Sequence, residues 1–274
     1  IYGSMTNTSI GQLFAAGILP GIALTVAFMA LIAAISVLHP GVAGPSLPDR
    51  PMREKLKSLL EILPPLLIFA IVMGVIYGGW ATPTESAAIG VTCALLVALA
   101  KRKMTLPLLH EAMISTVRIS AMILLIVAAG TMFMGTFAAN GGSSLIRSAV
   151  AGAGLGDVGM IVFFLLIVFL LGFVLDWTAN VLICVPLFTP FIRSAGIDPV
   201  WFGTLVIIVI QTSYLTPPMA SSIFYLKSIA PSDMTYGQMC RGVVPFILLQ
   251  VATLLIVALF PALATWLPSQ IVGF

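Results

Sequence analysis

The chain has 274 residues, of which 60% are hydrophobic and only 8% are charged, with a formal net charge of +3 at pH 7. A water-soluble domain carries about 25% charged residues, so this composition excludes an ordinary soluble enzyme and favours an integral membrane protein. No run of basic and aromatic residues indicates nucleic-acid binding, and the three separate cysteines indicate apolar packing rather than metal binding.

Long apolar runs predict helices that cross the membrane. Each run approaches the ~20 residues that a helix needs to span a hydrocarbon core of ~30 Å. The runs are Leu13–Leu38, Ile62–Trp80, Ile119–Ala139, Val158–Leu175 and Gly242–Leu267. We therefore expect an all-α, multi-spanning helical bundle. The chain opens at Ile1 without Met or a charged leader, and we expect its natural N-terminus to lie further upstream.

Two similar segments suggest an internal repeat. Gly11–Pro20 and Gly237–Pro245 share Gly-Gln, a later Gly, two branched aliphatic residues and Pro, about 225 positions apart. We expect residues 1–38 to close a first repeat, residues 39–61 to form a basic cytoplasmic loop, and residues 62–274 to form a second repeat.

The basic residues support repeats of opposite orientation. Threading the runs alternately through the membrane places only Arg147 and Arg193 outside. The residues then placed in the cytoplasm are Arg50, Arg53, Lys55, Lys57, Lys101, Arg102, Lys103, Arg118, Lys227 and Arg241. This distribution follows the positive-inside rule. Inverted repeats of this kind are typical of secondary transporters.

A polar break precedes the second repeat's next apolar run. Gly78–Ser86 is expected to form an outer turn that leads into a short helix. Thr84 or Thr82 would lie near the N-cap and Glu85 in the first turn, where a carboxylate complements the helix dipole. An ion-binding role for Glu85 is the alternative.

Residues 160–192 are expected to form a re-entrant hairpin. Two apolar arms, each too short to cross the membrane, flank the polar segment Asp176–Asn180. An Asp at the centre of a spanning helix costs about 2.5–3.5 kcal/mol, so Asp176 requires a helix end, a partner or a cation. A simple cap on an interfacial helix is the alternative.

Residues 200–230 are expected to form a broken helix. Pro217 and Pro218 remove two backbone donors and exclude the preceding turn from helical geometry. Two half-helices would then meet at a hydroxyl-rich joint, which survives at membrane depth only inside protein or beside a watery cavity. An ordinary proline kink is the alternative.

The two breaks together predict a cation site beside a carboxylate site. Carboxylate, hydroxyl and carbonyl oxygens suit Na⁺, whereas helix N-termini suit an anion. The candidate sodium ligands are Asp176, Thr178, Thr212, Ser213 and Thr216. The candidate substrate-binding residues are Thr178, Asn180, Pro218, Ser221 and Ser222. No cofactor other than Na⁺ as coupling ion is expected.

Other functions fit the residues less well. Gly152–Asp157 lacks the strand and the Lys of a phosphate-binding loop. It also resembles part of an intramembrane aspartyl protease signature, but no second Asp lies on an earlier membrane helix. An ion channel or a different kind of secondary carrier remains the alternative, and counterflow of substrate with saturation kinetics would distinguish a carrier from a channel.

Four ordered motifs carry a resemblance to a known family. They are Gly78–Ala88, Gly196–Gly203, Thr216-Pro217-Pro218, and Tyr2-Gly3 followed by Thr8–Pro20. Together they resemble the large membrane subunit (DctM type) of TRAP transporters, the tripartite ATP-independent periplasmic transporters. The resemblance covers essentially the whole chain.

The resemblance implies an elevator-type secondary transporter in the bacterial inner membrane. It implies sodium symport, a periplasmic substrate-binding protein and a small four-helix membrane subunit as partners. The bulky Leu175-Asp176-Trp177 at the hairpin tip is similar to a branch associated with 2-oxo acids, mannitol and chloroaromatic compounds. The expected substrate is an organic anion with a carboxylate, with a C4-dicarboxylate as one candidate.

Overall fold

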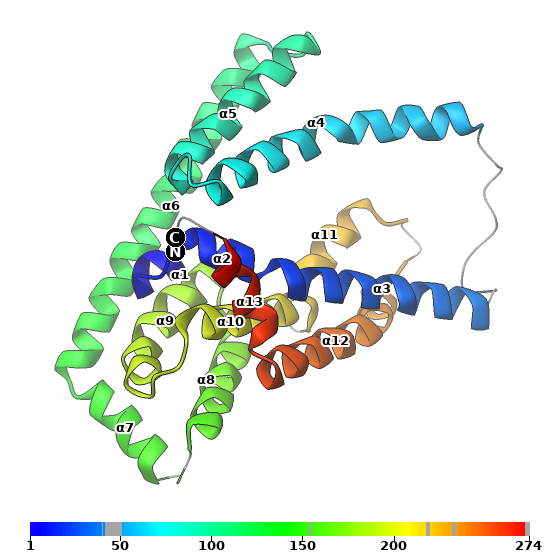
Figure 1. Cartoon of the computed structure of the whole chain (residues 1–274). Helices are drawn as coiled ribbons and strands as arrows, with labels where there is room; N and C mark the ends of the chain where they lie inside the picture. Colours follow the sequence, from blue (N-terminus) through cyan, green and yellow to red (C-terminus); the bar gives the residue numbers. More distant parts are fainter. Residues whose placement is uncertain are drawn as a thin grey trace. The chain divides into compact units, whose positions relative to one another are not determined.

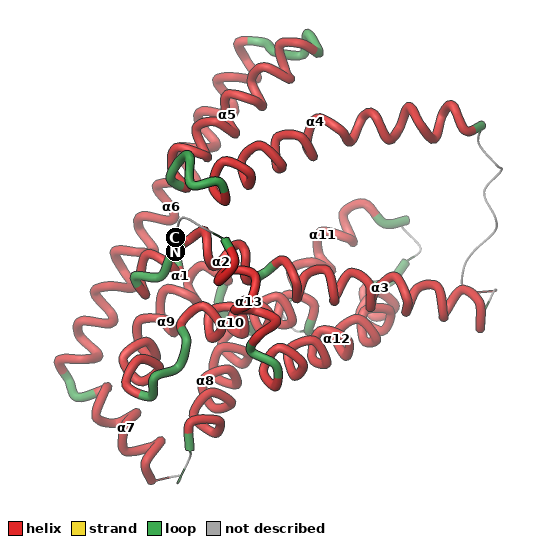
Figure 2. Tube along the Cα trace, in the orientation of Figure 1, coloured by secondary structure: helices red, strands yellow, loops and turns green. Residues whose placement is uncertain are grey.

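The computed structural model describes residues 1–39, 41, 51–152, 154, 156–217, 220–231 and 234–271. Within these ranges the chain forms α-helices and no β-strand, which confirms the all-α prediction (Figures 1 and 2). In chain order the helices are α1 (Tyr2–Thr6), α2 (Ile10–Ala16), α3 (Ile18–Leu38), α4 (Met52–Tyr77), α5 (Pro83–Ala100), α6 (Leu106–Ala139), α7 (Gly142–Gly152), α8 (Asp157–Leu171), α9 (Trp177–Ser194), α10 (Pro199–Leu215), α11 (Ser221–Ile229), α12 (Tyr236–Leu259) and α13 (Ala262–Gln270).

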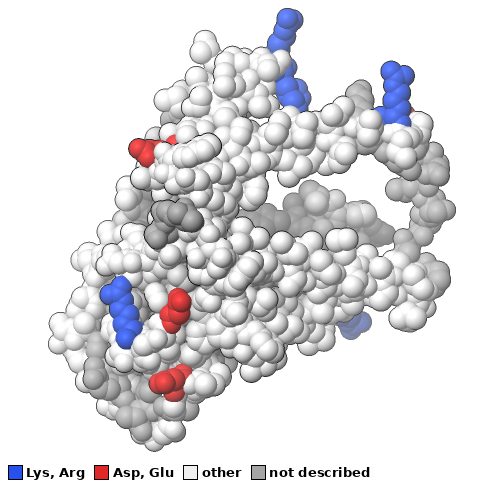
Figure 3. All heavy atoms as spheres, in the orientation of Figure 1, with Lys and Arg blue, Asp and Glu red and all other residues white. Residues whose placement is uncertain are grey.

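Five helical segments among the described residues are long and apolar enough to cross a membrane. They are Ile10–Leu38, Met52–Tyr77, Pro83–Ala100, Leu106–Ala139 and Tyr236–Leu259. Two further apolar helices, α8 and α10, are shorter. The face of the molecule in Figure 3 carries few charged side chains among its described residues. These features support an integral membrane protein.

Several helix boundaries differ from the sequence-based expectation. Helix α4 begins at Met52 and not at Ile62, so the described second half of the expected 39–61 loop is helical. This stretch is rich in Leu, Lys and Glu, which favour helices. Helix α6 begins at Leu106, well before the predicted run. The last predicted span is two helices, because Pro261 restricts Phe260 to non-helical angles and ends α12.

The chain divides into two compact units. Unit 1 combines Ile1–Phe28 with Ser120–Pro268, and unit 2 combines Met29–Ile119 with Ser269–Phe274. Unit 1 contains both predicted breaks, in the hairpin and in the broken helix. The candidate site therefore belongs to unit 1.

Helix α10 forms the centre of unit 1, where it packs against α2, α8, α9, α11 and α12. Its apolar side chains Leu205 and Val206 are buried, as is Phe164 on α8. The rings of Phe164 and Phe188 stack with centroids 4.1 Å apart and join α8 to α9. The indole of Trp201 donates a hydrogen bond of 2.8 Å to the carbonyl of Val257 and attaches α12.

Helix α1 is bound to the end of α9 and the start of α10. The hydroxyl of Tyr2 donates to the carbonyl of Pro199 over 2.6 Å. The guanidinium of Arg193 donates to the carbonyl of Thr6. The ring of Tyr2 also lies so close to Gly203 that a Cβ there would be 2.6 Å from it. These contacts hold the first residues of the chain against the α9–α10 connection.

In unit 2, α4 and α5 pack on one another through a short turn. Thr82 and Glu85 form a capping box at the start of α5. The Thr82 amide donates to Glu85 Oε2 over 2.8 Å, and the Glu85 amide donates to Thr82 Oγ1 over 3.3 Å. This arrangement confirms Thr82 as the N-cap and gives Glu85 a capping role.

Candidate functional site

The hairpin break lies slightly earlier than the sequence suggested. Helix α8 ends at Leu171 and α9 begins at Trp177, so the tip is residues 172–176. Asp176 is the N-cap of α9, and its Oδ2 accepts the Thr178 amide over 3.0 Å. Thr178 and Asn180 were expected in the polar tip, but they lie in the first turn of α9. A strong N-cap residue starts the helix as soon as its side chain replaces the missing backbone acceptor.

The two arms of the hairpin are joined by a buried amide. Asn180 is fully buried, and its Nδ2 donates to the carbonyl of Val168 over 2.9 Å. Its Oδ1 accepts from the thiol of Cys184 over 3.2 Å. These two bonds hold the arms of the hairpin together, while the second N–H of the Asn180 amide has no role in them. Thr178, also predicted to bind substrate, is buried as well.

The second break occurs where the proline pair predicted it. Helix α10 ends at Leu215 and α11 begins at Ser221. Thr216 has an extended conformation, and Ala220 has a left-handed one with φ of 34°. These angles confirm the interruption. Pro218 lies outside the described residues, whereas Ser221 and Ser222 form the first turn of α11.

The two breaks contact each other. The single hydroxyl proton of Ser213 is shared between the carbonyl of Phe169, at 3.3 Å, and that of Val209, at 3.1 Å. A Cβ on Gly172 would lie only 2.6 Å from the Ser213 Cβ, so Gly is required for this approach. The end of α10 therefore packs directly on the end of α8.

Among the remaining predicted sodium ligands, the hydroxyls face their own helix. Thr212 Oγ1 donates to the carbonyl of Ile208, and Thr216 Oγ1 donates to that of Thr212, each over 2.8 Å. Each hydroxyl oxygen can still accept a bond or contact a cation. The structure thus brings Ser213 next to the hairpin tip. Thr212 lies in the last turn of α10, and Thr216 is the residue directly after that helix.

Unit 1 also contains a cavity of about 760 Å³, which we call the aromatic cavity. Residues from α1, α2, α3, α9, α10, α11 and α12 line it. They are Ile1, Tyr2, Gly3, Ile10, Leu13, Phe14, Phe28, Trp177, Val181, Ile207, Ile210, Gln211, Tyr214, Leu215, Ser222 and Gln250. The cavity adjoins both breaks, because Trp177 follows the hairpin tip and Ser222 lies in the first turn of α11.

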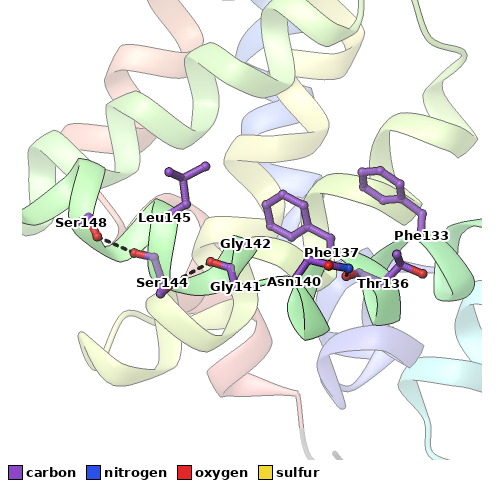
Figure 4. Close-up of a pocket in the computed structure, with 9 residues that line it drawn as sticks. All are labelled: Phe133, Thr136, Phe137, Asn140, Gly141, Gly142, Ser144, Leu145 and Ser148. Atoms are coloured by element: carbon purple, nitrogen blue, oxygen red, sulfur yellow. Dashed lines mark hydrogen bonds between the residues drawn. The ribbon is translucent and has the colours of Figure 1, made fainter.

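A second cavity, of about 600 Å³, lies at the turn from α6 to α7 (Figure 4). Its polar side chains are already engaged by the backbone. Asn140 Nδ2 donates to the carbonyl of Thr136, Ser144 to that of Gly141 and Ser148 to that of Ser144, over 2.6–2.7 Å. With its own polar groups satisfied, this cavity is the weaker candidate for binding.

The sequence interpretation missed the main polar group of the aromatic cavity. Gln250 is 1% exposed, and its Oε1 has no hydrogen-bond partner among the described residues. One signal was present in the sequence: a lone Gln inside the apolar run Gly242–Leu267, where a polar residue within a membrane helix marks a functional position.

Comparison with known proteins identifies relatives over nearly the whole chain. Residues 1–263 match the family described as "Tripartite ATP-independent periplasmic transporter, DctM component". The ectoine/5-hydroxyectoine TRAP transporter large permease protein UehC of Ruegeria pomeroyi is 34% identical over 97% of this chain and 61% of its own length. The C4-dicarboxylate TRAP transporter large permease protein DctM of Pseudomonas aeruginosa is 28% identical over 98% of this chain and 62% of its own length.

A third relative has a different stated substrate. The sialic acid TRAP transporter large permease protein SiaM of Vibrio cholerae is 30% identical over 100% of this chain and 63% of its own length. The chain thus spans between three-fifths and two-thirds of each of these three relatives. The family match and the apolar helices together make it an integral protein of the bacterial inner membrane, and its relatives are permeases and not enzymes. The chain belongs to the DctM family of tripartite ATP-independent periplasmic transporters.

Proposed function

We propose that this chain is part of the permease subunit of a sodium-coupled secondary transporter. In this role it imports a small organic acid that a periplasmic binding protein delivers, and it works with a small membrane subunit. The names of the relatives support a TRAP-type assembly, and they cover ectoine, C4-dicarboxylates and sialic acid.

The contact between the two helix breaks carries this proposal. Asp176 caps α9 at one break, and the hydroxyl of Tyr214, just before the other break, donates to Asp176 Oδ1 over 3.2 Å. Asp176 remains exposed, so its carboxylate is available to a cation. A sodium ion there would neutralise the carboxylate next to an anionic substrate.

The neighbouring helix end suits the anion. Helix α11 has no side-chain cap, so the positive end of its dipole and its first amides can bind a carboxylate. A cation at Asp176 and an anion at α11 attract each other, so each is expected to strengthen the binding of the other. Such reciprocal coupling is the thermodynamic basis of symport.

The test is sodium-driven uptake by the full-length protein with its partners in proteoliposomes. Asp176→Asn keeps a capping side chain but removes the charge. A hydrogen-bonded charge contributes about 1.5–3 kcal/mol, so the half-maximal Na⁺ concentration is expected to rise roughly 10- to 100-fold. An unchanged sodium dependence would remove Asp176 from the cation site.

Asp198→Asn is the matched control. Asp198 is also an N-cap aspartate, and its Oδ1 accepts the amides of Val200 and Trp201 at the start of α10. Its replacement is expected to leave the sodium dependence unchanged. A similar rise in both variants would indicate a general effect of losing a helix cap.

A further inference from the structure

We propose that the aromatic cavity holds the body of the transported acid. We further propose that this acid carries a single carboxylate on an apolar, aromatic body, and that Gln250 selects a hydroxyl or N–H group on that body. This inference rests on the proposed function, because it names the substrate class of the same site.

The lining of the aromatic cavity argues against a second charge on the substrate. None of its described lining residues is Asp, Glu, Lys, Arg or His. An ionised group taken out of water without a partner of opposite charge is strongly disfavoured. A dicarboxylate could place one carboxylate at the start of α11, but its second carboxylate would lie among apolar side chains.

The walls favour a flat apolar body. Trp177, Tyr214, Phe14 and Phe28 contribute aromatic rings to the cavity. The ring of Phe28 meets that of Phe246 edge-on with centroids 5.1 Å apart, which supports this wall from α12. The volume of about 760 Å³ lies within the range of small-molecule sites and exceeds the needs of a four-carbon acid.

The position of the carboxylate follows from the N-terminus of α11, where Ser222 is the second residue. Ser222 lines the cavity in the first turn of α11, whose N-terminus has no side-chain cap. A carboxylate bound there lies at the positive end of the helix, with its apolar body directed along the cavity. Tyr214 lines the same cavity and donates to Asp176 Oδ1, so a cation bound at Asp176 would lie beside the cavity wall.

Gln250 gives the cavity a polar preference. Its side chain is almost completely buried on α12, and its amide oxygen has no donor among the described residues. A buried acceptor without a donor is unfavourable, so a ligand that supplies an O–H or N–H group removes this cost. Gln250 is one of the residues that line the aromatic cavity, so a ligand bound there is in a place to supply this donor. The same acid without such a group leaves the cost in place.

The experiment uses the fluorescence of Trp177 and brominated acids, because bromine quenches indole fluorescence at contact distance. The probes are 3-(4-bromophenyl)propionate, 3-(4-bromophenyl)lactate, which adds a hydroxyl, and bromosuccinate, a dicarboxylate. They are titrated into the full-length protein in nanodiscs with NaCl present. The fluorescence of Trp177 is obtained by subtracting the fluorescence of the Trp177→Phe variant from that of the wild-type protein. The methyl ester of the propionate probe measures simple partition into lipid.

Both aromatic acids are expected to quench Trp177, and bromosuccinate is not. The lactate probe should bind about three- to tenfold more tightly than the propionate probe, as expected for one hydrogen bond. Gln250→Leu should abolish this difference while keeping the quenching. Gln270→Leu removes an exposed glutamine outside the cavity and should preserve the difference.

Several outcomes would overturn the inference. Quenching by bromosuccinate at equal or lower concentration would show that the cavity accepts two charges. An unchanged lactate preference in Gln250→Leu would remove Gln250 as the selecting group. Equal quenching by the methyl ester would indicate partition and not a site. Sodium-driven uptake of a dicarboxylate without quenching would leave the proposed function intact, whereas specific quenching without sodium-driven uptake would refute the function alone.

Discussion

The hydroxyl of Tyr214 donates a hydrogen bond of 3.2 Å to Asp176 Oδ1, although the two residues are 38 positions apart. The bond joins the residue that caps α9 to the last turn of α10. One side chain therefore contacts the candidate cation site and also lines the aromatic cavity. Tyr214 therefore connects the candidate cation site to the aromatic cavity, so that binding at one can affect binding at the other.

Tyr214→Phe tests this connection, because it keeps the ring in the cavity wall and removes only the hydroxyl. Loss of one hydrogen bond, about 0.5–1.5 kcal/mol, is expected to raise the half-maximal Na⁺ concentration roughly two- to tenfold. The increase should vanish when Asp176 is already Asn. Tyr77→Phe in unit 2 is the control. Additive effects of Tyr214→Phe and Asp176→Asn on the half-maximal Na⁺ concentration would argue against an interaction between these two side chains.

Gly172→Ala is expected to separate the two helix breaks. The new Cβ would lie 2.6 Å from the Ser213 Cβ, closer than real side chains approach. We expect a loss of transport and a lower thermal unfolding midpoint. Adding Ser213→Gly should restore part of the unfolding midpoint, because it removes the clashing atoms, but not transport, because Ser213 is a candidate sodium ligand. Gly135→Ala, which meets nothing within 4 Å, should leave both unchanged. Full activity of the single variant would show that the two ends are not in contact.

Position 220 is expected to tolerate a change from alanine to glycine better than a change from alanine to valine. Its φ of 34° lies in the left-handed region, which costs an L-residue about 1–2 kcal/mol and excludes β-branched side chains. Ala220→Gly should therefore be tolerated, while Ala220→Val should strongly lower the unfolding midpoint. At Ala128, inside α6, the order should reverse, since valine is a better helix residue than glycine. The same order at both positions would contradict the left-handed turn.

Single cysteines test the inverted topology in a variant without Cys93, Cys184 and Cys240. The distribution of basic residues predicts that Lys103→Cys is labelled from the cytoplasm and Ser194→Cys from the outside. Both positions are exposed in the structure. A membrane-impermeant maleimide applied to intact spheroplasts should therefore modify only Ser194→Cys. Modification of both positions from one side would exclude the predicted threading.

Much of the fold follows from local sequence chemistry. The proline pair predicted where α10 is interrupted, and Thr82 was one of two residues expected to cap α5, because each acts through its own backbone neighbours. Asp176 as a helix cap was only the alternative to an ion site. Helix α7 was not predicted, since it is short and bounded by glycines. The tip was misplaced by a few residues because Thr178 and Asn180 are polar but compatible with a first helical turn.

The site was less predictable than the fold. Which hydroxyls face a neighbouring helix depends on packing, so Ser213 and Thr212 looked equivalent in sequence although only Ser213 is seen to reach α8. The aromatic cavity gathers residues from seven helices, and no spacing along the chain reveals such a convergence. Gln250 became informative only when its amide oxygen was found without a donor.

The bonds that fasten α1 also bear on how the protein is made. The partner of Tyr2 lies 197 positions later, and that of Thr6 lies 187 positions later. At about 5–20 residues per second, a ribosome needs roughly 10–40 s to synthesise the intervening chain. These two bonds of α1 can therefore form only after translation has passed the start of α10, tens of seconds after α1 itself has been made.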